Sequence, residues 1–210
     1  MMYVVVYDIR DNKTRLRVAN ILEKYGERVQ YSCFEIGNYS QEIIKKLALI
    51  LSVRINYDTD RVFFYPISNY CRSYILRFPR KFGEIYEDLM DWKEELGRLT
   101  RRKFFYFLRD TLEMEIKSGK FSKYLLVYDI SDNLIRIKFS DILEEFSERV
   151  QLSAFEVPAS PNVIARIAVL AMQFAEIDDN LKVYLYPIDK GSEKKIIRIG
   201  SSYLSFRDIL

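Results

Sequence analysis

The sequence predicts an α+β protein built from two copies of one unit. Residues 3–36 align without a gap on residues 124–157, at an offset of 121, and 18 of the 34 positions are identical. Further along, a Tyr-Pro-Ile motif at 65–67 returns at 186–188 with the same offset. Within each copy, short runs rich in β-branched and aromatic residues alternate with segments of helical spacing. The chain is therefore an internal duplication of a unit that mixes strands and helices.

Each copy opens on an apolar run that predicts a buried strand. Residues 3–7 and 124–128 consist of Val, Leu and Tyr, a composition typical of a strand covered on both faces. The residue after each run is acidic, Asp8 in one copy and Asp129 in the other. Because an unpaired carboxylate is costly to bury, we expect both at the rim of a sheet, paired with a cation or bound to a metal.

A helix is expected after each opening strand. Asp11 or Asn12 is a suitable N-cap, and Gly26 stands where a left-handed residue ends many helices. The apolar face of this helix carries Val18, Ile21, Leu22 and Tyr25. Residues 28–36 alternate and are rich in Val, Tyr and Phe, which predicts one extended segment or two short strands.

A second helix and a further strand complete each unit. Ser40 caps this helix in the first copy, and Pro161 takes its first position in the second. Its buried positions are expected to be Ile43, Ile44, Leu47, Ala48, Ile50 and Leu51. Residues 62–65 form another strand, and residues 73–78 and 195–199 are candidates for one more in each copy.

The resulting order, βαββαβ, predicts a ferredoxin-like unit with two helices on one face of an antiparallel sheet. The other face of the sheet also needs cover. We therefore expect the two units to pack sheet to sheet as a pseudo-dimer within one chain. That packing would place Asp8 and Asp129 on opposite sides of a shared cleft.

Residues 81–123 belong to neither copy and predict a helical hairpin. Apolar residues keep helical spacing on both sides of Gly97, and the second run ends near Gly119. Its apolar positions are Phe104, Phe105, Leu108, Leu112 and Ile116. The predicted domains are residues 1–80, 81–123 and 124–210.

Composition narrows the chemistry. The chain contains no histidine, which excludes His-based acid–base catalysis, a serine-type triad and most zinc sites. Any reaction must use carboxylates, Tyr, Lys or Arg, together with a hard metal ion. No apolar run approaches the roughly 18 residues that a membrane span needs, and Asp8 and Arg10 interrupt any signal-peptide pattern. Cys33 and Cys71 are few and far apart, so we expect reduced thiols and a cytoplasmic protein.

The motifs of both copies resemble the Cas two family of CRISPR-associated proteins. They are Tyr-Asp-Ile followed by Asp, a basic start to the first helix, Glu-Arg-Val-Gln-Tyr-Ser-x-Phe-Glu, with Leu152 in place of this Tyr in the second copy, and a late Tyr-Pro. The resemblance covers about residues 1–78 and 124–199. It implies a ferredoxin-like dimer, here two members fused head to tail. It also implies either cleavage of RNA or DNA with magnesium, or a scaffold that holds DNA between Cas one integrase subunits.

The same resemblance implies roles for individual residues. Asp8 and Asp129 hold the metal, Mg²⁺ or Mn²⁺, and Tyr7 and Tyr128 stand beside them at the catalytic site. The nucleic-acid-binding positions are Arg15, Arg17 and Arg28 in the first copy and Arg136, Lys138 and Arg149 in the second. Lys138 keeps the charge of an arginine and loses its bidentate fork for phosphate. Because magnesium needs only one or two carboxylates, one ion shared by the two aspartates could activate a water against a phosphodiester.

Plainer interpretations stand beside these roles. A strand-end aspartate is often a turn residue, and the arginines suit a solvated helix face. Phe34 and Phe155 are expected in the core, and Tyr7 and Tyr128 suit packing with a wet hydroxyl. Three function classes stay open: a magnesium-dependent endonuclease acting on double-stranded DNA or single-stranded RNA, a non-catalytic DNA scaffold for the integrase, and a ferredoxin-like RNA-binding module.

The charge is distributed unevenly along the chain. Residues 1–80 carry 13 basic and 8 acidic side chains, whereas residues 124–210 carry 10 and 13. Phosphate contacts supply most of the sequence-independent affinity for nucleic acid. We therefore expect the first copy to make most of these contacts, helped by Arg98, Arg101 and Arg102 of the hairpin.

Overall fold

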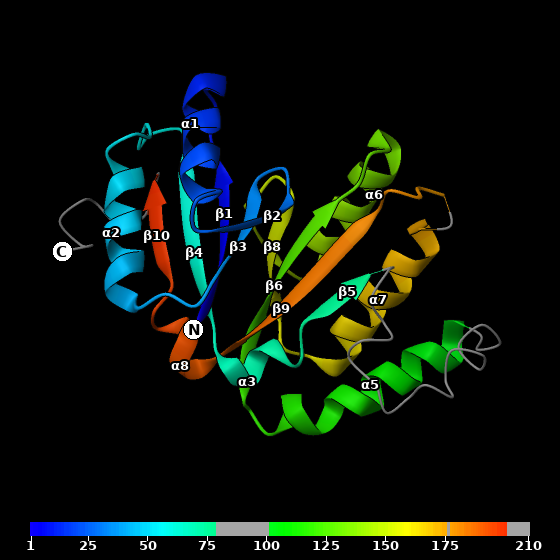
Figure 1. The fold of residues 1–210 in the computed structure, drawn as a ribbon. Coiled ribbons are helices and arrows are strands. Elements are labelled where there is room, and N and C mark those ends of the chain that lie inside the picture. Colours follow the sequence, from blue (N-terminus) through cyan, green and yellow to red (C-terminus); the bar gives the residue numbers. More distant parts are fainter. Residues whose placement is uncertain (79–100, 176, 201–210) are drawn as a thin grey trace. The chain divides into compact units, whose positions relative to one another are not determined.

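The chain forms two compact units, each an α+β fold with a five-stranded antiparallel sheet. The computed structural model describes residues 1–78, 101–175 and 177–200 (Figure 1). The first unit comprises residues 1–69 and the described residues from 191 onward, and the second lies within residues 70–190.

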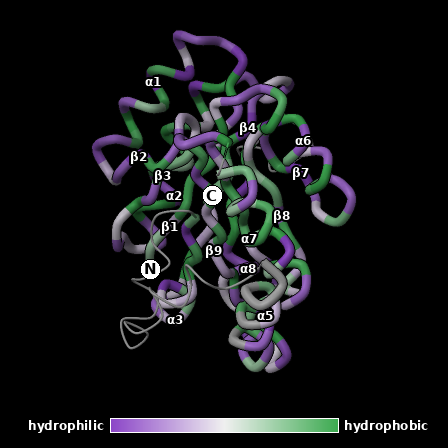
Figure 2. Tube along the Cα trace, turned by 90° about the vertical axis from the view of Figure 1, so that its right-hand side faces the viewer, coloured by the Kyte–Doolittle hydropathy of each residue, from purple (hydrophilic) through white to green (hydrophobic). Residues whose placement is uncertain are grey.

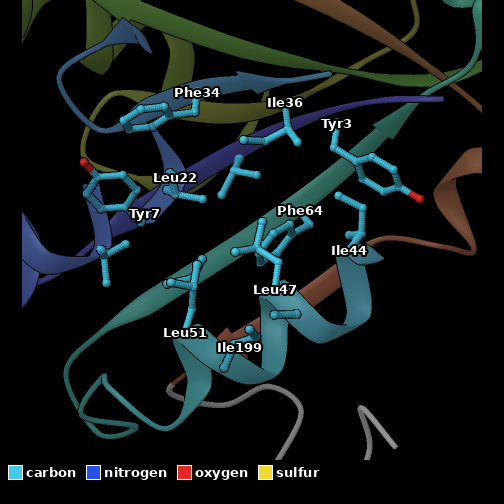
Figure 3. Close-up of a cluster of buried hydrophobic side chains, with 14 of the residues drawn as sticks. Tyr3, Tyr7, Leu22, Phe34, Ile36, Ile44, Leu47, Leu51, Phe64 and Ile199 are labelled. Carbon is cyan, nitrogen blue, oxygen red and sulfur yellow. The ribbon is translucent and has the colours of Figure 1, made fainter. Parts of the chain in front are cut away.

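The first unit has the predicted order of strands and helices. Its elements are β1 (Met2–Asp8), α1 (Asn12–Leu22), β2 (Gly26–Gln30), β3 (Cys33–Ile36), α2 (Gln41–Ser52), β4 (Arg61–Ile67) and β10 (Ile197–Gly200). The strand order is β10-β4-β1-β3-β2, so β1 is central. Alternate side chains of β1, those of Tyr3, Val5 and Tyr7, lie in one buried cluster with residues of α1 and α2 (Figure 3). The two helices therefore cover one face of this sheet.

The second unit repeats the arrangement and adds a long helix. Its elements are β5 (Leu76–Phe78), α5 (Arg101–Lys117), β6 (Phe121–Asp129), α6 (Asn133–Glu144), β7 (Glu148–Gln151), β8 (Ala154–Pro158), α7 (Pro161–Ala175) and β9 (Lys182–Asp189). The strand order is β5-β9-β6-β8-β7. Helix α5 packs against α7, and Leu108, Leu112 and Ile116 are buried as predicted. The predicted end of the hairpin is also confirmed, because Gly119 follows α5 with φ 68°.

The two copies exchange their last strands. β10 comes from the second copy and pairs with β4 of the first, with Ile199 opposite Val62. β5 comes from the first copy and pairs with β9 of the second, with Leu76 opposite Leu185. Two short helices, α3 (Asn69–Arg72) and α8 (Lys190–Glu193), lie where the chain passes between units. The predicted boundaries at residues 80 and 124 follow the sequence repeat, whereas the compact units follow this exchange.

The predicted helix starts are confirmed. The Asp11 carboxylate accepts a hydrogen bond from the Thr14 N–H at 2.7 Å, and its counterpart Asp132 accepts one from Ile135 at 2.9 Å. Helix α7 begins at Pro161. Both α1 and α6 mix hydrophobic and hydrophilic segments in Figure 2, as expected for helices that cover a sheet on one side.

Three predictions about single residues are wrong. Helix α1 ends at Leu22, and Gly26 opens β2 instead of ending the helix. A Cβ atom on Gly26 would lie 2.0 Å from the Glu35 carbonyl oxygen, so glycine is needed there for the close approach of β2 to β3. In α2, Ile43 and Ile50 are exposed by 39% and 37%, because the helical period puts the buried stripe one position away from each. The first helix of the predicted hairpin, from Phe82 to Leu96, lies outside the described residues.

A buried aspartate in each unit fixes the loop after the first strand. The Asp60 carboxylate accepts hydrogen bonds from the N–H groups of Arg10, at 3.1 Å, and Asn56, at 3.0 Å. The Asp178 carboxylate accepts bonds from the N–H groups of Ser131, Asp132 and Asn180, at 2.8, 3.1 and 3.0 Å. Burial raises the pKa of Asp178, but the hydrogen bonds from these backbone groups outweigh it and hold the pKa below its ordinary value. Each aspartate thereby ties the loop to the segment before the fourth strand.

We expect Gly26→Ala to destabilise the first unit by roughly 1–3 kcal/mol, the usual cost of forcing an extra methyl group into a packed site. Gly37→Ala is the matched control, because a Cβ atom on Gly37 would have its nearest neighbours at 3.9 Å. Urea denaturation followed by far-UV circular dichroism measures both. Equal stability of the two variants would contradict the close approach of β2 to β3.

We expect the stability that Asp178 contributes to depend on pH. Because its folded-state pKa is lowered, its ionised form favours the folded chain at neutral pH, and this contribution is lost as the pH falls below about 4. The Asp178→Asn variant should therefore be less stable than the unmodified chain at pH 7, by roughly 1–3 kcal/mol for lost hydrogen bonds to a buried group. The gap should narrow at pH 3. Asp179→Asn, at the exposed neighbour, should show no gap at either pH in the same urea titrations.

Candidate functional site

The two strand-end aspartates lie at the rims of their sheets, as predicted, in different surroundings. Asp8 is half-buried at the end of β1 and pairs in register with Arg61 of β4. Burial, helped by the negative charge of Asp60, holds the pKa of the Asp8 carboxyl above its ordinary value, although the charges of Arg61 and Arg15 act in the opposite direction. Asp129 is exposed at the end of β6, in register with Lys182. Each carboxylate thus has a basic residue across the strand pair, and only Asp8 is partly withdrawn from water.

Tyr7 and Tyr128 are buried anchors for the turn that follows the second strand of each unit. The Tyr7 hydroxyl donates to the carbonyl oxygen of Tyr31 at 3.1 Å, and the Tyr128 hydroxyl donates to that of Leu152 at 3.1 Å. Burial raises the pKa of Tyr7 to about 12, and burial also raises the pKa of Tyr128. The catalytic role that the resemblance implies for Tyr7 and Tyr128 stays a prediction.

The predicted core position of the two phenylalanines is confirmed. Phe34 and Phe155 are fully buried, and their ring centroids lie 6.2 Å from those of Tyr7 and Tyr128, with interplanar angles of 26° and 25°. The same ring pair is therefore built twice, directly beneath the two strand ends.

Arg28 and Arg149 cover these phenylalanines from the solvent side. Each guanidinium carbon lies 5.1 Å from the ring centroid, of Phe34 and Phe155 respectively. Arg28 also pairs with Glu23 at 3.0 Å, and Arg149 pairs with Glu144 at 2.8 Å. Because exposed ion pairs contribute little free energy, a phosphate group can compete with these carboxylates for both arginines.

The basic residues of the first helix differ between the units. Arg15 is half-buried on α1, donates to the Asn12 side-chain oxygen, and lies over the Tyr31 ring with its guanidinium carbon 5.3 Å from the centroid. Arg136 on α6 donates to Asn133 in the same way, but its unit has Leu152 where the first has Tyr31. Arg17 and Lys138 are exposed. Because the Tyr31 backbone is tied to Tyr7, the residue before Asp8, the Arg15 guanidinium and the Tyr31 ring lie next to the end of β1.

The donor set fits a hydrated hard cation better than zinc. Among the described residues, no group of three or more His, Cys, Asp or Glu side chains is arranged to hold a metal. A structural zinc ion needs such a closed set, whereas Mg²⁺ keeps several waters and accepts one or two carboxylates. Asp8 and Asp129 each offer one carboxylate at a sheet rim. They belong to different units, so the shared cleft and the shared ion stay predictions.

The basic cluster predicted on the hairpin is outside what the structure describes. Arg98 precedes the described part, and for Arg101 and Arg102 only their place at the start of α5 is defined. The sequence analysis does not predict the roles of Asp60 and Asp178. These two residues lie 118 positions apart, whereas the aligned positions of the repeat lie 121 apart. Their high burial would have been hard to see, but an acidic residue just before the fourth strand in both copies was visible.

Cys33 and Cys71 are both buried, and neither forms a disulfide bond. None of the described helices combines the length and the apolarity that crossing a membrane requires.

Comparison with known proteins gives one consistent family. A family model for CRISPR associated protein Cas2 matches residues 1–75 and again residues 122–196. CRISPR-associated endoribonuclease Cas2 4 of Rhodospirillum rubrum is 45% identical over 64 residues, which are 30% of this chain and 51% of that protein. CRISPR-associated endoribonuclease Cas2 1 of Archaeoglobus fulgidus is 39% identical over 74 residues, 35% of this chain and 78% of that protein. The chain thus spans about half the length of the first relative and more of the second.

Among solved structures, Streptococcus pyogenes Cas2 at pH 6.5 is 32% identical and aligns over 34% of this chain and 93% of that one, with a TM-score of 0.31. The family model matches each copy of the repeat separately, and together the two matches cover most of the sequence. The chain therefore belongs to the Cas2 family of CRISPR-associated proteins and contains two copies of the family's unit in tandem.

Proposed function

We propose that this chain is a CRISPR adaptation protein that binds nucleic acid and hydrolyses phosphodiester bonds with the help of Mg²⁺. The observation that carries the proposal is the rim of the first sheet, where the half-buried Asp8 carboxylate stands in register with Arg61 of β4 and the next helix, α1, carries Arg15. A carboxylate for a hard cation and cationic groups for a phosphate are the two requirements of this chemistry. The name endoribonuclease carried by the relatives supports the same activity.

In this proposal some residues bind the metal and others bind phosphate groups. Asp8 and Asp129 would hold Mg²⁺, which supplies Lewis acidity and an activated water when bound. Arg15, with its guanidinium already oriented by Asn12, binds the scissile phosphate and offsets the negative charge that develops in the transition state. Arg28 binds a neighbouring phosphate in exchange for Glu23.

In this proposal Tyr7 positions the turn beside Asp8 and does not transfer a proton. Its hydroxyl is committed to the Tyr31 carbonyl, and its pKa of about 12 lies far from the range in which a group transfers protons efficiently at neutral pH. It therefore holds the turn beside Asp8 at a fixed distance from the strand end. Tyr128 does the same for the turn at Leu152.

A non-catalytic scaffold is the second candidate. The observation that favours it is the exposed position of Asp129 opposite Lys182, which gives the second copy a less specialised strand end than the first. In this function the same basic residues would hold double-stranded DNA, with Cas one integrase subunits as partners. Single-stranded RNA is the alternative ligand of the nuclease.

We also propose a ferredoxin-like fold for each unit and a cytoplasmic location for the protein. The strand order β4-β1-β3-β2, with α1 and α2 on one face, supports a ferredoxin-like unit. The two buried cysteines, which form no disulfide, support a cytoplasmic location.

If both aspartates serve one ion, Asp8→Ala and Asp129→Ala should each lower cleavage roughly 100-fold, and the double variant should lose little more, because the pair acts as a unit. Cleavage of labelled single-stranded RNA and duplex DNA in Mg²⁺ or Mn²⁺ measures this. Glu42→Gln, at an exposed carboxylate in the first turn of α2, is the control and should retain full activity. Cleavage that survives the double variant or excess chelator would refute the metal-dependent mechanism and leave the scaffold function.

The uneven charge predicts unequal binding by the two units. Replacing Arg15 and Arg17 with Ala should weaken nucleic-acid binding roughly ten-fold and flatten its salt dependence, because phosphate contacts are lost. Replacing Arg136 and Lys138 with Ala should have a smaller effect, since these residues lie in the acidic half of the chain. Fluorescence anisotropy across a salt series measures both double variants. Equal losses would show that the charge asymmetry has no role in binding.

A further inference from the structure

The turn between the second and third strands presents a different side chain in each unit. In the first unit it is Tyr31, whose side chain is 57% exposed, and in the second it is Leu152, 67% exposed. The two residues occupy equivalent positions of the sequence repeat. Because neither side chain packs in the core, the difference between them has little to do with the stability of the fold.

The backbone of the two turns is the same. In the first turn, the Tyr31 carbonyl oxygen accepts a hydrogen bond from the Tyr7 hydroxyl at 3.1 Å, and the Ser32 carbonyl oxygen accepts one from the Tyr7 N–H at 3.1 Å. The Gln30 side-chain oxygen accepts a hydrogen bond from the Ser32 N–H at 3.0 Å. In the second, the corresponding distances are 3.1, 3.0 and 3.0 Å. The Tyr31 ring therefore projects from a turn that is held on both sides, and little conformational entropy is lost when a ligand contacts it.

A cation lies against this ring. The Arg15 guanidinium carbon is 5.3 Å from the Tyr31 centroid, and the Tyr31 backbone is tied to Tyr7, the residue before Asp8. Exposed aromatic rings among basic side chains are the usual platform for unpaired bases, because every base has a π-face and every nucleotide brings a phosphate. In a duplex the bases are stacked inside the helix and cannot reach such a ring.

We propose that Tyr31 stacks on an unpaired base of single-stranded nucleic acid while Arg15 binds an adjacent phosphate, and that the second unit, with Leu152 at this place, lacks the stacking contact. The inference rests on the proposed nucleic-acid binding and adds to it a residue contact that favours single strands over duplexes. One unit of the chain thus distinguishes single strands from duplexes, and the other contributes phosphate contacts alone.

The chain supplies its own matched variants for the test. Tyr31→Leu installs the side chain that the second unit already carries in an equivalent turn, so the turn tolerates it. Tyr31→Phe keeps the ring and removes the hydroxyl, and Leu152→Ala alters the other turn. Each variant is titrated by fluorescence anisotropy with labelled single-stranded RNA, single-stranded DNA and duplex DNA of the same length.

We expect Tyr31→Leu to bind both single strands roughly ten-fold more weakly, the loss typical of one stacked base, with an unchanged salt slope because no phosphate contact is removed. Its affinity for duplex, and all affinities of Tyr31→Phe and Leu152→Ala, should stay within about two-fold of the unmodified chain. A loss confined to RNA or to DNA would identify which single strand is bound.

Two outcomes overturn the inference in distinguishable ways. Undiminished binding of single strands by Tyr31→Leu, or an equal loss for single strands and duplex, would exclude base stacking and leave the proposed nucleic-acid binding intact. Failure of the unmodified chain to bind any of the three probes would overturn the proposed function as well.

Discussion

The position of every candidate site residue follows from one constraint, the burial of the central strand of each sheet. β1 is covered along its length by helix side chains on one face, and it lies between β4 and β3, so it cannot carry a charge before it reaches the rim of the sheet. Asp8, the last residue of β1, is the first one there that is only half-buried. The tyrosine before it still points into the core and ties down the neighbouring turn through its hydroxyl. Acid, anchored turn and basic helix are thereby brought together by the end of a strand, not by a separate loop.

Because the two copies lie within one chain, the residues around one strand end can change while those around the other stay the same. In a dimer of identical subunits a substitution appears in both sites at once, whereas here the copies change separately. The structural parts of the site, namely the ring pairs, the caps and the buried aspartates of the loops, are the same in both units. Two parts that face solvent differ: Tyr31 corresponds to Leu152, and the half-buried Asp8 to the exposed Asp129. Such a pattern is expected when both copies must keep the same buried packing while their solvent-facing residues can change independently.

Much of the fold could be predicted because its signals are local. The opening strands, the Asp11 cap and the Pro161 helix start each depend on a few adjacent residues. Gly26 was misjudged because its role depends on the Glu35 carbonyl in the neighbouring strand, a contact that helix-end patterns do not contain. Asp60 and Asp178 were missed because their partners include backbone groups of a distant loop. Their offset also differs from that of the repeat, so they do not align with each other. The rim position of the aspartates was predictable from burial, whereas a shared ion depends on how two separate units meet.

The exchange of last strands has a consequence for how the protein is made. Ile197 of β10 pairs with Phe64 of β4, so most of the chain must leave the ribosome before the first sheet receives its fifth strand. Until then the β4 edge has unpaired backbone groups, which is the kind of edge that recruits other nascent chains. Contacts between such distant residues also slow folding. A chain truncated after its first copy would lack β10, so its β4 edge would stay available for pairing with other chains.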